Sequence, residues 1–231
     1  MGNKFNKTFI LKHINNNIPN FEIKCNNSIY NREKKTILKL FSNLKNINID
    51  YRIKSIKYFF KHLKKFNLDD GILFLSVDLF DKSIVQIDND IQNINLYLIL
   101  IISLSYKYID DNKILDISYI IKYVNYKYNK NDILLFEIKL LSFLDYKLSH
   151  PRLDSFIYYY LDKLKLYEID MIKLIKKSKL ILFDYKRHYY KNSLLAISLI
   201  IINMKNNIFD SINICYQYTD INLIYKSKNK F

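Results

Sequence analysis

Glycine and proline are rare in this sequence, and tryptophan is absent. Two glycines and two prolines occur among 231 residues. Sheets need many tight turns, and tight turns usually require glycine or proline. We therefore expect an all-α protein whose helices are joined by short loops of Asn, Asp and Lys. Half of the residues are hydrophobic and 16% are aromatic, which is enough to form one core or two cores of roughly 100 residues each.

Cysteine and histidine are too few and too scattered for a disulfide framework or a metal motif. Cys25 and Cys215 stand far apart, and there are four histidines. The sequence also has no glycine-rich phosphate loop, and His62 and His150 have no neighbouring nucleophile. These absences favour a reduced, intracellular, non-enzymatic protein without a metal or cofactor. We expect His62 to lie at the surface or at the core boundary.

Arginine is scarce although the chain is strongly basic. The net charge is +15, yet only four of the 37 basic residues are arginines. Lys, Asn, Ile and Tyr have AT-rich codons, so a solvated surface shaped by genome composition is one interpretation. Attraction to nucleic acid or acidic partners is the other. Arginine is the usual reader of base edges, so specific DNA recognition is not favoured.

The apolar periodicity divides the chain into an extension, a helix and two helical groups. We predict an extension over 1–27, a helix over 28–46, and two domains over 47–149 and 150–231. Asp69 is a candidate N-cap and Pro151 marks the joint between the domains. The helices of the first domain are predicted at 52–66, 69–87, 91–108, 113–124 and 131–145. Those of the second are predicted at 151–164, 168–182, 190–204, 207–217 and 219–226.

One segment is apolar on every side. The run LYLILIISLSYKYI, residues 96–109, contains a lysine and is shorter than the roughly 20 apolar residues of a membrane span. A helix that is hydrophobic all round is a central helix wrapped by others. We predict that residues 96–106 are the most buried part of the protein.

Five residues have a characteristic spacing, and they carry a resemblance to a known family. They are Arg52, Asp81, Leu96, Lys107 and Glu137. The string from 51 to 84, YRIKSIKYFFKHLKKFNLDDGILFLSVDLFDKSI, aligns without a gap with the first two helices of the cyclin box. SYKYIDD at 105–111 and EIKLLSFLDYKLSHP at 137–151 are similar to later parts of it. The string FDYKRHYYKNSLLAISLIIIN at 183–203 resembles a second, more divergent cyclin fold.

The resemblance implies roles for these residues. Arg52 and Asp81 would form a buried ion pair between the first two helices of the box, so that removal of one would leave the other unpaired. Leu96 would belong to the core. Lys107 and Glu137 would meet at a kinase-facing surface and bind backbone groups at the end of the kinase's regulatory helix. The alternatives are unrelated surface charges for the first pair and a plain intramolecular salt bridge for the second.

The same resemblance places four apolar or aromatic residues at or near the kinase-facing surface: Tyr108, Leu141, Tyr146 and Leu148. Other positions depart from the family. Tyr51, Ser55 and Tyr58 replace residues of the substrate-docking patch found in many cell-cycle cyclins, so docking of RxL-type substrates is not expected. No RxxL string is present, so a standard destruction box is not expected either.

The resulting prediction is an all-α protein of tandem cyclin-box repeats. It would form a heterodimer with a cyclin-dependent kinase, activate it and control cell-cycle progression, in the nucleus, the cytoplasm or both. No catalytic residue, small-molecule substrate, metal or membrane association is expected, and nucleic acid is not the expected partner. The alternatives are a transcription-type cyclin, a cyclin-fold general transcription factor of the TFIIB kind that binds DNA and polymerase, and a scaffold without a kinase partner.

Overall fold

Helices make up all the regular structure in the described part of the chain. The computed structural model describes residues 49–88, 90–110, 116–149, 151–163, 165–166 and 169–203. Within these ranges there are eight α-helices, two 3-10 helices and no strands. The all-α class predicted from the scarcity of glycine and proline is thus confirmed. The helices predicted at 28–46, 207–217 and 219–226 lie outside the described residues.

The first group of helices follows the predicted order closely. Its members are α3 (Ile49–Phe66), α4 (Asp70–Asp88), the 3-10 helix η1 (Ile91–Asn93), α5 (Ile94–Ile109), α6 (Ile117–Tyr123) and α7 (Lys130–Phe143). The carboxylate of Asp69 accepts a hydrogen bond from the Gly71 N–H at 2.7 Å, as expected for the residue that caps α4. Asn129 caps α7 through a reciprocal capping box with Asp132.

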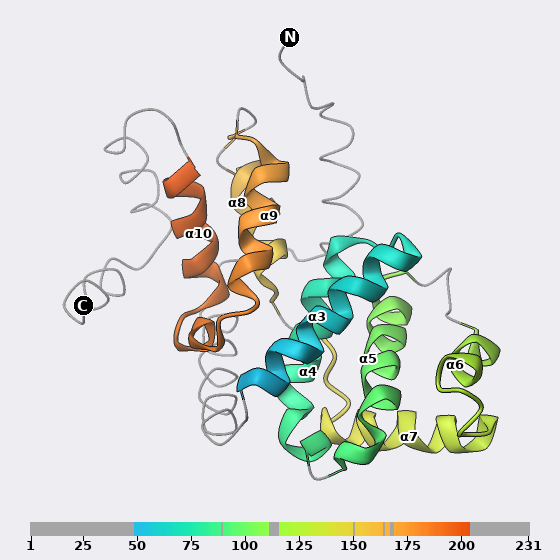
Figure 1. Cartoon of the computed structure of the whole chain (residues 1–231). Coiled ribbons are helices and arrows are strands. Elements are labelled where there is room, and N and C mark those ends of the chain that lie inside the picture. Colours follow the sequence, from blue (N-terminus) through green and yellow to red (C-terminus); the bar gives the residue numbers. More distant parts are fainter. Residues whose placement is uncertain are drawn as a thin grey trace.

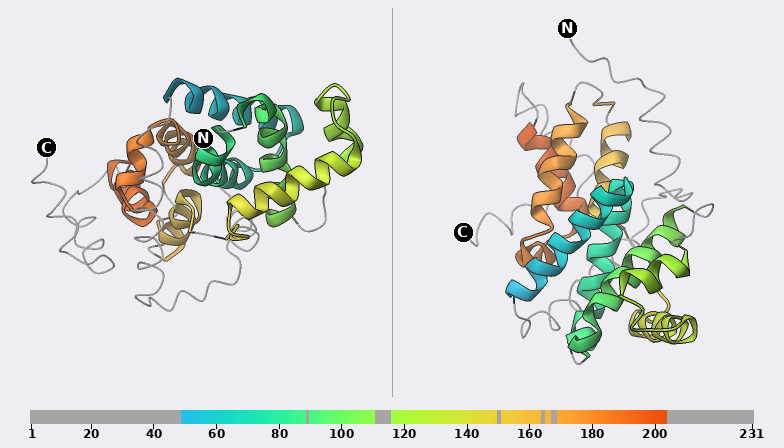
Figure 2. Two further views of the ribbon diagram at one scale, coloured as in Figure 1. Left: turned by 90° about the horizontal axis from the view of Figure 1, so that it is seen from below. Right: turned by 45° about the vertical axis from the view of Figure 1, so that its right-hand side comes forward.

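The second group contains α8 (Leu153–Lys163), α9 (Met171–Ile181), the 3-10 helix η2 (Tyr185–Tyr189) and α10 (Asn192–Asn203). Pro151 lies just before α8 rather than in its first turn. The first backbone bond of α8 runs from Phe156 N–H to the Arg152 carbonyl. In Figures 1 and 2, α8–α10 lie on one side of the molecule, and α6 lies at the end opposite α10.

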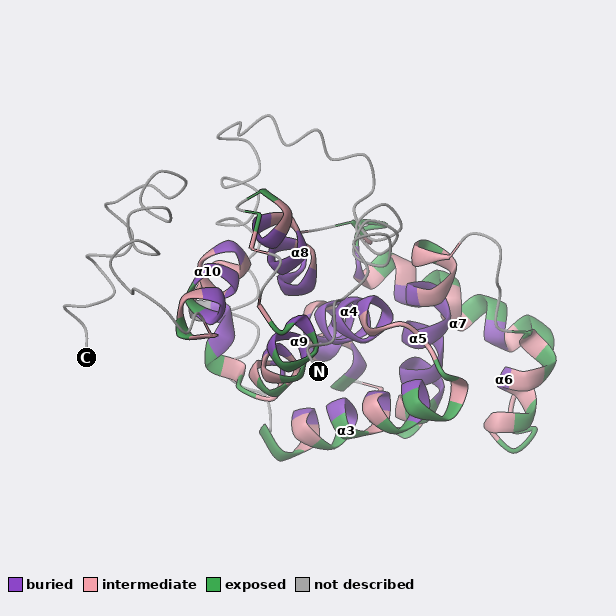
Figure 3. Cartoon of the chain, turned by 90° about the horizontal axis from the view of Figure 1, so that it is seen from above, coloured by how far each residue is buried: buried purple, intermediate pink, exposed green. Residues whose placement is uncertain are grey.

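The two central helices are α4 and α5, as their composition predicts. Helix α4 packs against α3, α5, α7 and α8, so it contacts both groups. In α5, every residue from Leu96 to Ser105 is buried, and the burial ends at Tyr106. Figure 3 shows both helices in the buried interior. Burial of the run 96–106 is therefore confirmed except at its last residue, but it is not the most buried part of the protein, because residues 71–81 of α4 are all buried as well.

One prediction about the first helix is wrong. His62 is buried, with 4% of its surface exposed. Its ring stacks on Tyr58 with centroids 4.0 Å apart, and Tyr123 of α6 meets it edge-on at 5.0 Å. The Nδ1 atom lies 2.8 Å from the Tyr58 carbonyl oxygen. Tyr123 of α6 helps to cover the ring, a contact that the pattern of α3 alone does not reveal.

Candidate functional site

The predicted pair in the first two helices makes direct contact. Arg52 on α3 binds Asp81 on α4 through two hydrogen bonds, from Nε to Oδ1 at 2.7 Å and from Nη2 to Oδ2 at 2.8 Å. Arg52 is 1% exposed and Asp81 is fully buried. The fork of the guanidinium matches the carboxylate, which is the strongest geometry for such a pair. The alternative of two unrelated surface charges does not apply.

This pair also connects the two groups of helices. The guanidinium of Arg52 donates to the carbonyl oxygens of Leu182 at 2.9 Å and Phe183 at 3.1 Å, just after α9. From η2, Arg187 donates to Asp78 at 2.6 Å and to Asp81 at 2.9 Å. One buried cluster of charges therefore positions the second group of helices on the first.

The electrostatics of the cluster depend on Asp81. Burial alone would raise the pKa of the Asp81 carboxyl, but the charge of Arg52 and the contact with His188 hold that pKa well below its usual value. His188 Nε2 lies 2.8 Å from Asp81 Oδ2. Burial, aided by the positive charge of Arg187, lowers the pKa of His188. With His188 neutral, two arginines are balanced by Asp78 and Asp81.

Sequence reasoning identified Arg52 and Asp81 but missed Asp78, Arg187 and His188. It expected Asp81 to lose its only partner if Arg52 were removed, whereas Asp81 also contacts Arg187 and His188. Arg187 and Asp81 are 106 residues apart. Nothing in the local pattern of either segment indicates that they meet, so only the fold could reveal the contact.

The second predicted pair lies at the surface, between α5 and α7. Lys107 Nζ is 2.5 Å from Glu137 Oε1, and the two side chains are 37% and 14% exposed. The intramolecular salt bridge considered for this pair is thus present in the isolated chain. Lys107 has further N–H donors, and Glu137 has a second oxygen. The pair can therefore offer a donor and an acceptor to one partner while it stays intact.

A second ion pair positions α7 beside the start of α5. Lys139 Nζ lies 2.8 Å from Asp90 Oδ2, and the Tyr97 hydroxyl donates to the same oxygen at 2.8 Å. Burial and the bond to Asp90 raise the pKa of Tyr97 to about 12. This contact adds to the packing of α7 on α5, and so holds Glu137 opposite Lys107.

A cavity of about 430 Å³ opens beside the Lys107–Glu137 pair. Its lining comes from α5, from α6 with its capping residue Asp116, and from α7. Apart from the pair, the residues that line it are Ser103, Asp116, Ile117, Ile120, Ile133 and Leu134. The buried hydroxyl of Ser103 has no hydrogen-bond partner within the described residues. The pair thus stands at the edge of a mostly apolar depression.

The four other predicted surface residues lie on the same two helices or just after them. Tyr108 is 36% exposed in the last turn of α5. Leu141 lies one turn after Glu137 and is half-buried, as is Leu148 beyond the end of α7. Tyr146 is 66% exposed and has a left-handed backbone, with φ of 55°.

Three further apolar side chains on α7 are exposed, and sequence reasoning missed them. Leu134, Leu135 and Ile138 have exposed fractions of 41%, 65% and 56%. Leu134, Ile138 and Leu141 follow the helical spacing of one face. A row of apolar residues on one helix usually indicates burial against the core. Here part of that row faces solvent, which is typical of a protein-binding surface.

The comparisons with known proteins identify the family. A family model described as "Cyclin, N-terminal domain" matches residues 24–149, more than half of the chain. The chain belongs to the cyclin family. No curated protein matches it. Cyclins are regulatory subunits without catalytic chemistry of their own, and a cyclin domain implies binding to a protein partner.

The described part of this cyclin has neither a metal-binding cluster nor a membrane-spanning helix. Among its described residues, no group of three or more His, Cys, Asp or Glu side chains is placed to hold a metal ion. No helix within the described ranges has the length and hydropathy needed to cross a membrane.

Proposed function

We propose that this cyclin binds a cyclin-dependent serine/threonine protein kinase through the surface formed by α5 and α7, and that binding activates the kinase. The Lys107–Glu137 pair, with exposed apolar side chains on both sides of it, carries the proposal. Binding hot spots combine a central polar contact with apolar surroundings that exclude water. This arrangement fits the end of a helix on a partner protein.

The chemistry of the pair suits a helix end. A helix terminus leaves backbone N–H or C=O groups without partners. The ammonium of Lys107 can donate to such a carbonyl, and the free oxygen of Glu137 can accept from an N–H. Leu135, Ile138 and Tyr146 would then lose their solvent exposure against the kinase. The cyclin would act by stabilising one position of the kinase's regulatory helix, which shifts a population and needs no catalytic group.

The biological setting of the proposal is the control of cell-cycle progression, in the nucleus, the cytoplasm or both. A transcription-type cyclin would use the same surface with a different kinase. We keep the division into a first box over 47–149 and a second over 150–231 as part of the proposal. Affinity capture of the protein from its native cells, followed by mass spectrometry, would name the partner. Recovery of RNA polymerase without a kinase would contradict the proposal.

The direct test uses Lys107→Ala and Glu137→Ala in a binding titration with the captured kinase. Each change removes one charge-assisted contact at a surface that the complex buries, which costs about 2–5 kcal/mol, or roughly 30-fold or more in affinity. Because the two residues act on one helix end, the double variant should lose less than the sum of the two singles. Kinase activity should fall in parallel at limiting cyclin concentration.

The matched control is Lys130→Ala, which removes an exposed lysine from the first turn of the same helix, α7. It should leave affinity within about twofold. Circular dichroism and thermal melts would show that all variants are folded. Normal affinity in both Lys107→Ala and Glu137→Ala would refute the assigned surface, even in a correctly folded cyclin.

A further inference from the structure

Lysines dominate the exposed face of α3, after Ile49 and Asp50 in its first turn. Between residues 54 and 65, every exposed position of this helix is a lysine: Lys54, Lys57, Lys61, Lys64 and Lys65. The first four are separated by three, four and three residues, the spacing that places side chains in one row along a helix. At 1.5 Å per residue this lysine row, Lys54–Lys57–Lys61–Lys64, is about 15 Å long.

The lysine row follows one exposed carboxylate, Asp50, on the same side of α3. None of its four members forms an ion pair with any described residue. Two other exposed or half-buried lysines are paired, Lys139 with Asp90 and Lys179 with Asp70. Like charges three and four residues apart destabilise a helix. An anionic partner would reduce that repulsion.

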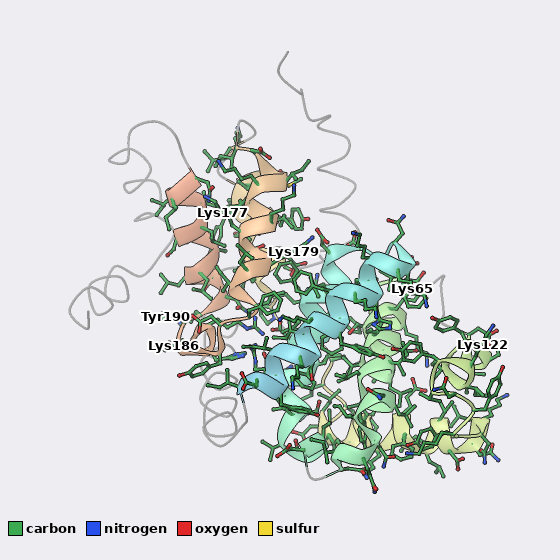
Figure 4. All side chains as sticks on the ribbon, in the orientation of Figure 1. Lys65, Lys122, Lys177, Lys179, Lys186 and Tyr190 are labelled. Carbon is green, nitrogen blue, oxygen red and sulfur yellow. The ribbon has the colours of Figure 1, made fainter. Side chains whose placement is uncertain are left out.

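The row is accessible and separate from the α5–α7 surface. Figure 1 shows α3 crossing the front of the molecule, and Figure 3 shows exposed residues along its outer edge. Figure 4 labels Lys65 near the carboxyl end of α3, far from Lys186 on η2. Half-buried aromatic contacts flank the row: Phe60 stacks on Phe183 at 5.2 Å on one side, and Tyr58 contacts Tyr123 on the other.

The side chains around the row favour a protein ligand over a nucleic acid. Proteins that bind single strands stack bases on exposed aromatic rings, and no aromatic ring of α3 is exposed. Proteins that bind duplexes combine Lys with Arg and with polar side chains on the phosphates. The arginines within the described residues, Arg52, Arg152 and Arg187, are all buried. Between the lysines of this face no exposed polar residue is found.

We propose that the lysine row of α3 is a docking site for an acidic protein segment, an extended run of Asp and Glu residues. At about 3.3 Å per residue, five residues of extended chain match the length of the row. This inference goes beyond kinase binding and uses a different helix. It gives the cyclin a means of selecting partner proteins by their acidic segments.

The test is a fluorescence anisotropy titration of the full chain with a labelled hexaglutamate peptide at low salt. The row variant replaces all four row lysines with glutamine. The matched control replaces four scattered, exposed lysines with the same change of net charge: Lys122, Lys130, Lys163 and Lys173. We expect the row variant to bind at least about tenfold more weakly and the control to change by no more than about twofold. Binding by the unaltered protein should weaken with salt.

Several outcomes would overturn the proposal. Equal losses in the row variant and the control would show that net charge alone attracts the peptide. Tighter, row-dependent binding to a duplex or single-stranded DNA probe of matched charge would assign the row to nucleic acid. The absence of binding to hexaglutamate at low salt would also contradict it. Lys107→Ala should leave hexaglutamate binding unchanged, so the two proposals can fail independently.

Discussion

Replacement of Asp81 by alanine should destabilise the protein severely. Asp81 accepts two hydrogen bonds from Arg52 and one from Arg187, and it contacts His188. Without it, Asp78 is the only carboxylate in the cluster that balances the two buried guanidiniums. Breaking a buried ion pair on one side typically costs about 3–5 kcal/mol. For a chain of this size that corresponds to a fall in Tm of about 6–20 °C.

Thermal melts of three variants would separate charge from packing. Asp81→Asn keeps the shape of the side chain but removes its charge, so its loss of stability should approach that of Asp81→Ala. Asp88→Asn makes the same change at an exposed position of α4, and its free energy of unfolding should stay within about 0.5 kcal/mol of that of the unaltered protein. Arg52→Ala should also destabilise, because it opens a buried space and removes the donors to the carbonyls of Leu182 and Phe183.

A double-mutant cycle gives the sharpest result. Arg52 and Asp81 share two hydrogen bonds, so the double alanine variant should lose at least about 1 kcal/mol less than the sum of the two singles. The reasoning would be refuted if Asp81→Asn melted within about 2 °C of the unaltered protein. Strict additivity of Arg52→Ala and Asp81→Ala would equally show that the pair is not coupled.

Two further predictions concern pH and the central helix. Burial lowers the pKa of both His188 and His62. As pH falls toward and below 6.5, these two residues therefore bind more protons in the unfolded chain than in the folded one. The free energy of unfolding should fall as pH drops from 7.5 to 5.5. In denaturant titrations the free energy of unfolding of His188→Asn should fall less over that range than that of the unaltered protein. An equal pH dependence of the two would contradict the role of His188. Leu100→Ala in α5, where Leu100 is 1% exposed, should cost about 2–5 kcal/mol. Leu135→Ala, at a 65% exposed site, should cost less than about 0.5 kcal/mol in the same assay.

The ends of the helices show how far the sequence predicts local backbone conformation. Scarcity of glycine predicted loops of Asn, Asp and Lys, and the described residues with positive φ are Asn67, Asn125, Tyr126, Asp145, Tyr146 and Lys165. Asn and Asp tolerate the left-handed region better than other non-glycine residues. Tyr126, Tyr146 and Lys165 adopt it as well. The N–H groups of Tyr126 and Tyr146 donate to the carbonyls of Ile121 and Leu141, which closes the preceding helix through the backbone whatever the side chain. The sequence therefore predicted where helices end, but not which residues at those ends adopt the left-handed conformation.

Properties that depend on a few neighbouring residues could be derived from the sequence alone. The helical period, the Asp69 cap and the all-round apolarity of α5 act within one or two turns, so they predicted the helices and the central position of α5. Resemblance to the cyclin box supplied the residue pairs of α3–α4 and α5–α7. Tertiary structure alone brought Arg187 to Asp81, buried His62 under α6 and exposed the apolar face of α7. These contacts join segments far apart in the chain, and no local pattern records which distant surface a side chain will meet.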